Sequence, residues 1–128
     1  MTKKFVLCVD GVYVKNGKIL LLKRSVEPFK GCWHLIGGHV EENETLKEAL
    51  KREFKEETNL TVRVGGIIDG RIEETVDRIK IIVALKIMGS RGKIKPASES
   101  EESVGSMRFH AILAIIGLST WSRKKGTE

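Results

Sequence analysis

The sequence contains few cysteines and no long hydrophobic run. Its two cysteines, Cys8 and Cys32, have neither the spacing of a metal site nor the number that a disulfide framework needs. No run reaches the roughly 18 apolar residues of a transmembrane helix. The N-terminal stretch lacks the helical apolar core and the small-residue cleavage site of a signal peptide. We therefore expect a cytoplasmic protein without disulfides and without a membrane partner.

Acidic residues are outnumbered by basic ones. Lys and Arg total 23 against 17 Asp and Glu, which gives a net charge of +6, and one basic cluster lies at residues 123–126. Such an excess attracts an anionic partner, either nucleic acid or a phosphate-rich small molecule, although a solvated basic surface has the same composition. Because zinc-finger, basic-zipper and RNP signatures are missing, nucleic acid remains an alternative that no motif supports.

The chain length and the pattern of apolar residues predict one domain, residues 1–128. Asn16-Gly17 is a strong hairpin signal between two β-rich runs. The predicted strands are residues 5–14, 18–24, 61–68, 78–88 and 107–110, with loops at 25–43 and 89–106 and a short buried helix at 111–118. A short strand at the start of the second loop is an option. This order predicts an α/β fold, in which a mixed sheet is covered by helices on both sides.

Residues 44–60 have the periodicity of one amphipathic helix. Thr45 and Glu48 have the spacing of a capping box at its start. The apolar stripe consists of Leu46, Ala49, Leu50 and Phe54, and the solvent side carries Lys47, Lys51 and Lys55. We expect this stripe to pack on the sheet.

Two carboxylates, Glu53 and Glu57, project from the apolar stripe, and Glu56 can converge with them on one edge. Burying a carboxylate costs several kcal/mol unless a partner compensates. Arg52 lies on the flank of the stripe, nearer Glu56 and Glu48 than Glu57. A hard divalent cation with oxygen ligands, above all Mg²⁺, would explain three crowded acids. The alternative is an exposed, glutamate-rich helix end.

The stretch from Gly38 to Leu60 resembles the Nudix box, G-x5-E-x7-R-E-U-x-E-E-x-G-U, where U is a bulky aliphatic residue. Gly38, Glu44, Arg52-Glu53 and Glu56-Glu57 occupy its defining positions, and the preceding WHLIGG is similar to the family's W-x-L-P-G-G. Three residues depart from the pattern without removing chemistry: Ile36 replaces Pro, Phe54 replaces an aliphatic residue, and Asn59 replaces Gly. Asn is the next-best residue for a left-handed helix end, so we expect the turn to be kept.

The resemblance implies a Nudix-type α/β/α sandwich with a mixed β-sheet between helices. It also implies hydrolysis of a pyrophosphate linkage with Mg²⁺, for which Mn²⁺ can substitute. Glu53, Glu56 and Glu57 would ligate the metal together with the carbonyl of Gly38. Catalysis would involve Glu53, Arg52, Glu56 and a later acid, with Arg52 orienting a glutamate. Glu44 would tie the loop to the helix rather than bind metal.

The general base is open among Glu99, Glu101 and Glu102. Glu102 is favoured because EESVGSMRF resembles the family's acid-rich lead into its last strand, and the alternative is an acidic loop without a catalytic role. His39 is a candidate for phosphate binding or proton transfer, or else a bystander. Trp33 and Phe29 could stack a base, although core packing is the simpler expectation for Trp33.

The short chain resembles MutT-type nucleoside triphosphate pyrophosphohydrolases, so the predicted partner is a nucleotide. Two alternatives remain. One is an enzyme that acts on a nucleotide sugar or an RNA 5′ end, which the basic tail and a steep salt dependence would favour. The other is a non-catalytic nucleotide-sensing domain, whose usual mark is a degraded acid cluster; the intact glutamates argue against it. The sequence leaves the substrate, the number of metal ions and the oligomeric state open.

Overall fold

The computed structural model describes residues 2–23, 27, 30–94 and 103–108, the last segment by its backbone. The elements along the chain are β1 (Lys4–Val12), β2 (Val14–Lys15), β3 (Lys18–Lys23), β4 (Trp33–His34), β5 (Ile36–His39), α1 (Leu46–Thr58), β6 (Thr61–Glu74), β7 (Arg78–Arg91) and β8 (Ser103–Arg108).

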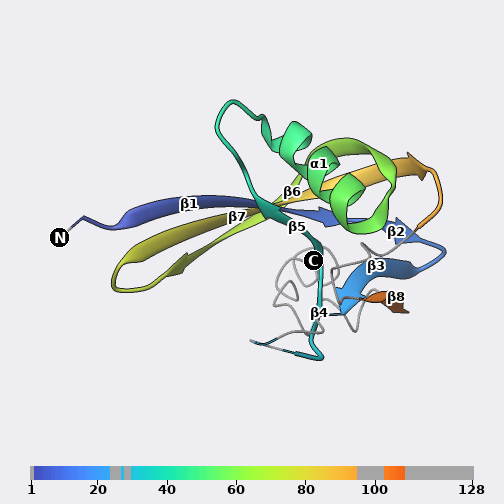
Figure 1. The fold of residues 1–128 in the computed structure, drawn as a ribbon, viewed down its shortest axis with the longest axis horizontal. Coiled ribbons are helices and arrows are strands. Elements are labelled where there is room, and N and C mark those ends of the chain that lie inside the picture. Colours follow the sequence, from blue (N-terminus) through green and yellow to red (C-terminus); the bar gives the residue numbers. More distant parts are fainter. Residues whose placement is uncertain (1, 24–26, 28–29, 95–102, 109–128) are drawn as a thin grey trace, which may run out of the picture.

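Two sheets organise the described part of the chain. The larger has the order β5-β1-β7-β6; β1 and β7 run parallel, while the β1–β5 and β6–β7 pairs are antiparallel. In the smaller sheet β3 pairs with β2, β4 and β8. Figure 1 shows β1, β6 and β7 as long, twisted strands with α1 lying against one end of them. The prediction of an α/β fold with a mixed sheet is confirmed.

The first hairpin follows the Asn-Gly signal. Asn16 and Gly17 have φ angles of 55° and 74°, and Lys15 pairs with Lys18 across the turn. Positive φ at both central residues is the geometry that suits the right-handed twist of the flanking strands. The predicted hairpin is therefore confirmed.

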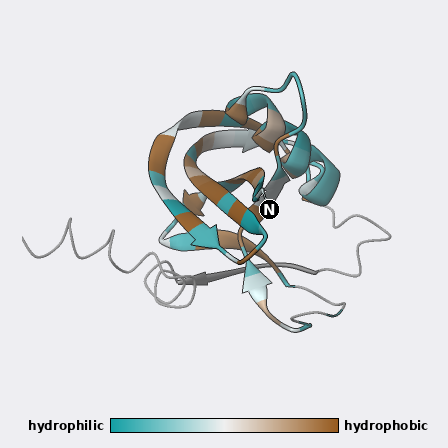
Figure 2. Ribbon diagram, turned by 90° about the vertical axis from the view of Figure 1, so that its left-hand side faces the viewer, coloured by the Kyte–Doolittle hydropathy of each residue, from teal (hydrophilic) through white to brown (hydrophobic). Residues whose placement is uncertain are grey.

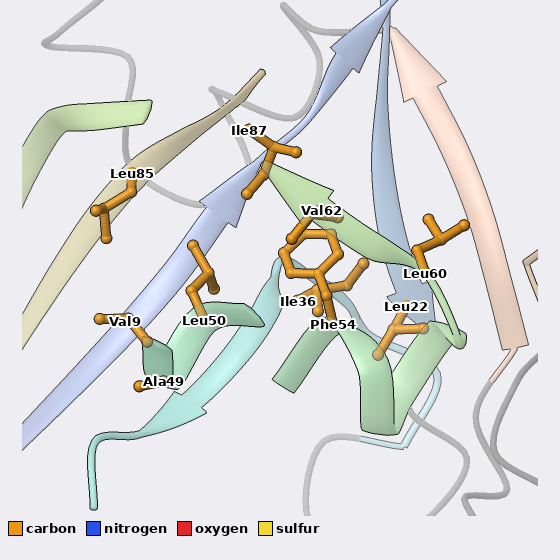
Figure 3. Close-up of a cluster of buried hydrophobic side chains, with 10 residues drawn as sticks. All are labelled: Val9, Leu22, Ile36, Ala49, Leu50, Phe54, Leu60, Val62, Leu85 and Ile87. Carbon is orange, nitrogen blue, oxygen red and sulfur yellow. The ribbon is translucent and has the colours of Figure 1, made fainter. Parts of the chain in front are cut away.

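The main core lies between α1 and the larger sheet (Figure 3). Leu50 and Phe54 of α1 have no exposed surface and pack with Val9 of β1 and with Leu85 and Ile87 of β7. β1 can approach the helix because Gly11 has no side chain: a Cβ there would lie 2.3 Å from Phe54 Cε1. Truncating a buried Phe of this kind typically costs about 3–5 kcal/mol, so the helix is held mainly by its apolar stripe.

The opposite face of the larger sheet meets the smaller one. A second buried cluster there contains Val12, Ile19, Leu21, Leu35 and Ala84, and Trp33 packs against it. Side chains alternate along a strand. In β1, therefore, Val9 points toward α1, whereas Cys8, Asp10 and Val12 point toward the face that carries the second cluster.

Several predicted boundaries are wrong. The loop predicted at 25–43 contains β4 and β5, which the two glycines of β5 concealed because glycine carries no strand signal. β6 has register shifts between Arg63 and Asp69 and runs on to Glu74. Residues 69–74 are mostly polar and therefore carry no alternating apolar signal. β7 continues to Arg91, which agrees with the optional short strand there, whereas β8 starts at Ser103 inside the predicted loop. The predicted helix at 111–118 lies outside the described residues.

Long stretches of the larger sheet extend beyond α1. Figure 2 shows apolar bands along these strands, and Phe5, Ile72 and Val76 are exposed by 70%, 68% and 91%. In the part of the chain that the structure describes, no helix has the length and apolar character needed to cross a membrane.

Candidate active site between β5 and α1

Both ends of α1 are set by local chemistry. At the N-terminus Thr45 Oγ1 accepts a hydrogen bond from the Glu48 N–H at 3.1 Å, and Glu48 Oε1 accepts one from the Thr45 N–H at 2.9 Å. At the C-terminus Asn59 has φ 67° and its N–H donates to the Lys55 carbonyl at 3.1 Å. The predicted capping box and left-handed Asn59 are confirmed. Glu48 is thus engaged at the cap.

Arg52 of α1 contacts both the chain segment that follows β5 and the glutamates of its own helix. Its guanidinium donates twice to Glu44, with Nε–Oε2 at 2.7 Å and Nη2–Oε1 at 3.1 Å, and once to the His39 carbonyl at 2.9 Å. Nη1 reaches Glu53 at 3.1 Å and Glu56 at 3.4 Å. The hydrogen bond from Arg52 lowers the pKa of Glu44 and raises that of Arg52 itself. Both groups are therefore charged at neutral pH, and they tie β5 and its following loop to α1.

The Glu53 carboxylate lies directly against β5. A Cβ built on Gly38 would stand 2.4 Å from Glu53 Oε2, a distance that real side chains do not tolerate. Burial raises the pKa of Glu53, and the charge of Arg52 and a hydrogen bond with Glu57 oppose that rise. Glycine at position 38 thus allows a carboxylate and the strand backbone to share one small space.

The three glutamates differ in exposure. The Glu53 side chain is 13% exposed, the Glu56 side chain is 59% exposed, and Glu57 is half-buried with a buried Oε1. Glu53 and Glu57 interact with each other, and Arg52 lies between Glu53 and Glu56. Among the residues described, no three or more His, Cys, Asp or Glu side chains form a ready-made metal cage.

The residues around Gly38 nevertheless fit a hard divalent cation. All the candidate ligand atoms are oxygens. Any side chain at position 38 would fill the space between the Gly38 backbone and the Glu53 carboxylate. Mg²⁺ keeps several waters and is commonly bound through one or two carboxylates plus substrate phosphates. A complete protein cage is therefore not required for such an ion.

The remaining sequence candidates fall into two groups. His39 contributes its carbonyl to Arg52, and its side chain is exposed. Trp33 is half-buried, packs against the second core cluster and has Lys23 Nζ 5.8 Å from its ring centroid, which favours core packing over base stacking. The others, Phe29, Glu99, Glu101 and Glu102, lie outside the described residues.

Sequence reasoning missed a polar cavity of about 270 Å³ beside β5, with Asp10, His34, Arg71 and Lys80 in its lining. Burial raises the pKa of Asp10 to about 6, against the opposing charges of Arg71, Lys80 and His34. An acid among the inward-facing residues of an apolar strand was a usable signal. Arg71 could not be placed, because the predicted strand ended at residue 68.

Comparisons with known proteins identify the family and the fold. The NUDIX domain model matches residues 4–124. The chain is 40% identical over 103 residues to the ADP-ribose pyrophosphatase of Methanocaldococcus jannaschii, a match that covers 76% of this chain and 59% of that protein. It is 34% identical over 77 residues to the CTP pyrophosphohydrolase of Escherichia coli, covering 59% and 57%. The chain thus spans less than two thirds of either relative.

Solved structures share the fold. The E. coli ORF135 protein superposes with a TM-score of 0.77 at 25% identity, covering 88% of this chain and 79% of that one. The MutT protein of Methanosarcina mazei superposes with a TM-score of 0.81 at 24% identity, covering 98% and 99%. Because the family model matches nearly the whole length of this chain, the chain belongs to the NUDIX domain family, and it has the Nudix fold.

Proposed function

We propose that this protein is a divalent-metal-dependent hydrolase that cleaves the pyrophosphate linkage of a nucleoside diphosphate derivative. The observation that carries the proposal is the close approach of the Glu53 carboxylate to Gly38, beside an arginine that also contacts Glu56. The names of the two relatives, a pyrophosphatase and a pyrophosphohydrolase, support the same reaction class.

In this proposal Glu53, Glu56, Glu57 and the Gly38 carbonyl hold Mg²⁺, or Mn²⁺ in its place. The bound ion would neutralise phosphate charge and acidify water. Arg52, anchored by Glu44, keeps Glu53 and Glu56 oriented and limits their mutual repulsion. Glu102, one residue before β8 in the sequence, is proposed to accept the proton of the attacking water.

Two substrate classes are supported by different observations. The sequence prediction of a nucleoside triphosphate agrees with the name of the E. coli relative, CTP pyrophosphohydrolase. The longer and more similar match, to an ADP-ribose pyrophosphatase, favours a nucleoside diphosphate joined to a sugar. Both classes present the same pyrophosphate linkage to the acids of α1.

A substrate panel tests the reaction class. Nucleoside triphosphates, nucleoside diphosphate sugars and 5′-triphosphorylated RNA would be incubated with the protein and Mg²⁺, and the products separated by chromatography. We expect hydrolysis of at least one small nucleotide and a loss of about 100-fold or more in Glu53→Gln, the range for losing a key electrostatic group. Lys55→Gln, on the solvent side of α1, is the control. No hydrolysis of any member at any Mg²⁺ or Mn²⁺ concentration would contradict the proposal.

A further inference from the structure

A second cavity, of about 630 Å³, lies at the corner of the larger sheet where β6 begins and β7 ends. The β1–β2 connection, α1 and these two strands all contribute to its walls, and Figure 1 shows this corner beside α1 and β2. Among the described residues it shares no lining residue with the cavity beside β5, and none of the α1 glutamates lines it. This corner cavity is therefore separate from the candidate active site.

The lining of the corner cavity is basic. Four exposed cations from β2, α1, β6 and β7 take part in it: Lys15, Lys51, Arg63 and Arg91. No Asp or Glu occurs among the described lining residues, and none of the four cations forms an ion pair with an acid in the described part of the chain. Cations gathered in one concave site without opposite charge focus a positive potential that attracts anions.

Arg63 lies across the neighbouring strand. It pairs with Gly89 of β7, where a Cβ would stand 2.7 Å from Arg63 Nη2, so glycine allows the guanidinium to approach the β7 backbone. The next residue, Ser90, has its Oγ 2.8 Å from Tyr13 Oη, and this hydrogen bond ties the β1–β2 connection to β7. The cavity walls are thus held by strand pairing and a side-chain hydrogen bond, as a binding site requires.

The positive charge continues into an adjoining cavity of about 400 Å³, which shares Tyr13, Lys15 and Ser90 with the first. Lys18 lines it and lies directly opposite Lys15 in the β2–β3 hairpin. Like charges at facing positions destabilise a strand pair, and an anion bound between them relieves this repulsion. Because its described lining also contains no Asp or Glu, the two cavities together match a chain of negative charges better than a single anion.

A nucleic acid strand matches these cavities less well. Sites for single strands combine a basic groove with aromatic side chains on which the bases stack. Tyr13 is the one aromatic residue in the described lining; it is half-buried, packs against the main core and has its hydroxyl bonded to Ser90. The volume of the corner cavity also falls in the range of about 300–1,000 Å³ that is typical of small-molecule sites.

We propose that the corner cavity and its neighbour form a second anion site, which binds the oligophosphate chain of a small molecule. Inorganic oligophosphate and the phosphate tail of a nucleotide share this chemistry. The guanidinium groups of Arg63 and Arg91 bind phosphate oxygens in pairs, and Lys15 and Lys51 add point charges. The inference goes beyond the proposed hydrolysis, since none of these residues belongs to the acids that would hold the metal.

Isothermal titration calorimetry of the full chain with sodium tripolyphosphate tests the site, in EDTA so that no metal bridges the ligand to the acids of α1. We expect saturable binding by the wild type. The double variant Arg63→Gln/Arg91→Gln should lose about tenfold or more in affinity, in the range for losing charge-assisted hydrogen bonds.

The matched control is Lys4→Gln/Arg78→Gln, which removes the same charge where β1 and β7 begin, at the opposite end of β7 from Arg91. It should bind tripolyphosphate within about twofold of the wild type, because distant exposed charges are screened by salt. Equal losses in both double variants would reduce the effect to net charge and overturn the inference. So would a wild type that does not bind at millimolar tripolyphosphate.

Gly89→Ala tests the geometry without changing any charge. The added methyl group must displace the Arg63 guanidinium, the flexible end of a side chain, so the melting temperature should stay at the wild-type value. Tripolyphosphate affinity should fall by about threefold or more, the effect of misplacing part of one charged contact. An unchanged affinity would contradict the assignment of Arg63 to the site.

Two further ligands identify the source of the oligophosphate. ATP without metal should also bind more weakly to Arg63→Gln/Arg91→Gln than to the wild type, and the tighter of ATP and tripolyphosphate indicates whether a nucleotide or an inorganic chain is preferred. A single-stranded oligonucleotide with a 5′ hydroxyl should bind at least about tenfold more weakly than either, for want of a stacking surface. Tighter binding of the oligonucleotide would overturn the proposed ligand class. Because every titration is done without metal, none of these outcomes depends on the hydrolase proposal.

Discussion

At the scale of single residues, Arg52 joins the loop that follows β5 to the acids of α1. Its planar fork binds Glu44 through two parallel contacts, a geometry that the single ammonium of lysine cannot reproduce. We expect Arg52→Lys to lower kcat/KM by about tenfold or more, in the range for losing a positioning contact. Steady-state kinetics measure this loss. Lys51→Arg on the same helix controls for changes of cation type, and equal activity of both variants would show that Arg52 has no positioning role.

Glu57 is half-buried beside Glu53, so two carboxylates share a partly desolvated space. Glu57→Gln keeps the shape and removes one negative charge. The metal-free variant should therefore be at least as stable as the metal-free wild type but strongly impaired in hydrolysis. Mg²⁺ should raise the melting temperature of the wild type more than that of the variant, because a ligand bound only to the folded state adds RT ln(1 + [L]/Kd).

Lys55→Gln is the matched control for Glu57→Gln, since it changes a charge by one unit on the exposed side of the same helix. Should Glu57→Gln unfold the metal-free protein while Mg²⁺ protects both forms equally, Glu57 would be a structural partner and its assignment as a ligand would be wrong.

Asp10 makes stability depend on pH. Its pKa is raised from 3.8 to about 6, so the folded state binds more protons than the unfolded state between these values, and stability falls as pH rises through this window. A shift of about 2 units corresponds to at most about 3 kcal/mol. Asp10→Asn should thus raise the free energy of unfolding at pH 8 but not at pH 3.5, measured by urea denaturation. A gain of equal size at both pH values would contradict the raised pKa.

At the scale of elements, the end of α1 depends on one left-handed residue. Asn59 has φ 67° and no β-branch. Asn59→Gly should be neutral or mildly stabilising, whereas Asn59→Val should cost about 1 kcal/mol or more, because a β-branched side chain is strained in this region. Thermal denaturation of the two variants measures the difference. Identical stabilities would mean that the helix end relaxes to another conformation.

The predictability of each element depends on where its signal lies. Some elements are specified by residues close together in the sequence, namely α1 with its caps and the Asn16-Gly17 hairpin. Their capping residues, apolar stripe and turn residues all predicted the observed structure. β5 could not be predicted, because its residues Gly37 and Gly38 are selected by the groups that approach them from β1 and α1. The same holds for the site: the acids of α1 were visible as a motif, whereas the Asp10 cavity depends on the register of three strands.

At the scale of the whole molecule, β5 is an edge strand of its sheet, and it separates the acids of α1 from the Asp10 cavity: Gly38 faces Glu53, and Gly37 lies against Asp10. The apolar stripe of α1 fixes the helix on one face of the sheet, and the second cluster fixes β3 and β4 on the other. The polar residues of the proposed site therefore lie where two separately packed layers meet. Such a border between packed layers is a common place for a ligand site, since both walls are rigid.

The central claim, that this border holds a divalent metal for pyrophosphate hydrolysis, is tested most directly by removing the metal. The protein would be dialysed against EDTA and then against metal-free buffer, and hydrolysis of its best substrate followed while Mg²⁺ or Mn²⁺ is added back. We predict no measurable turnover in the metal-free sample and full recovery on addition of either ion. Undiminished hydrolysis by a rigorously metal-free sample would contradict the claim.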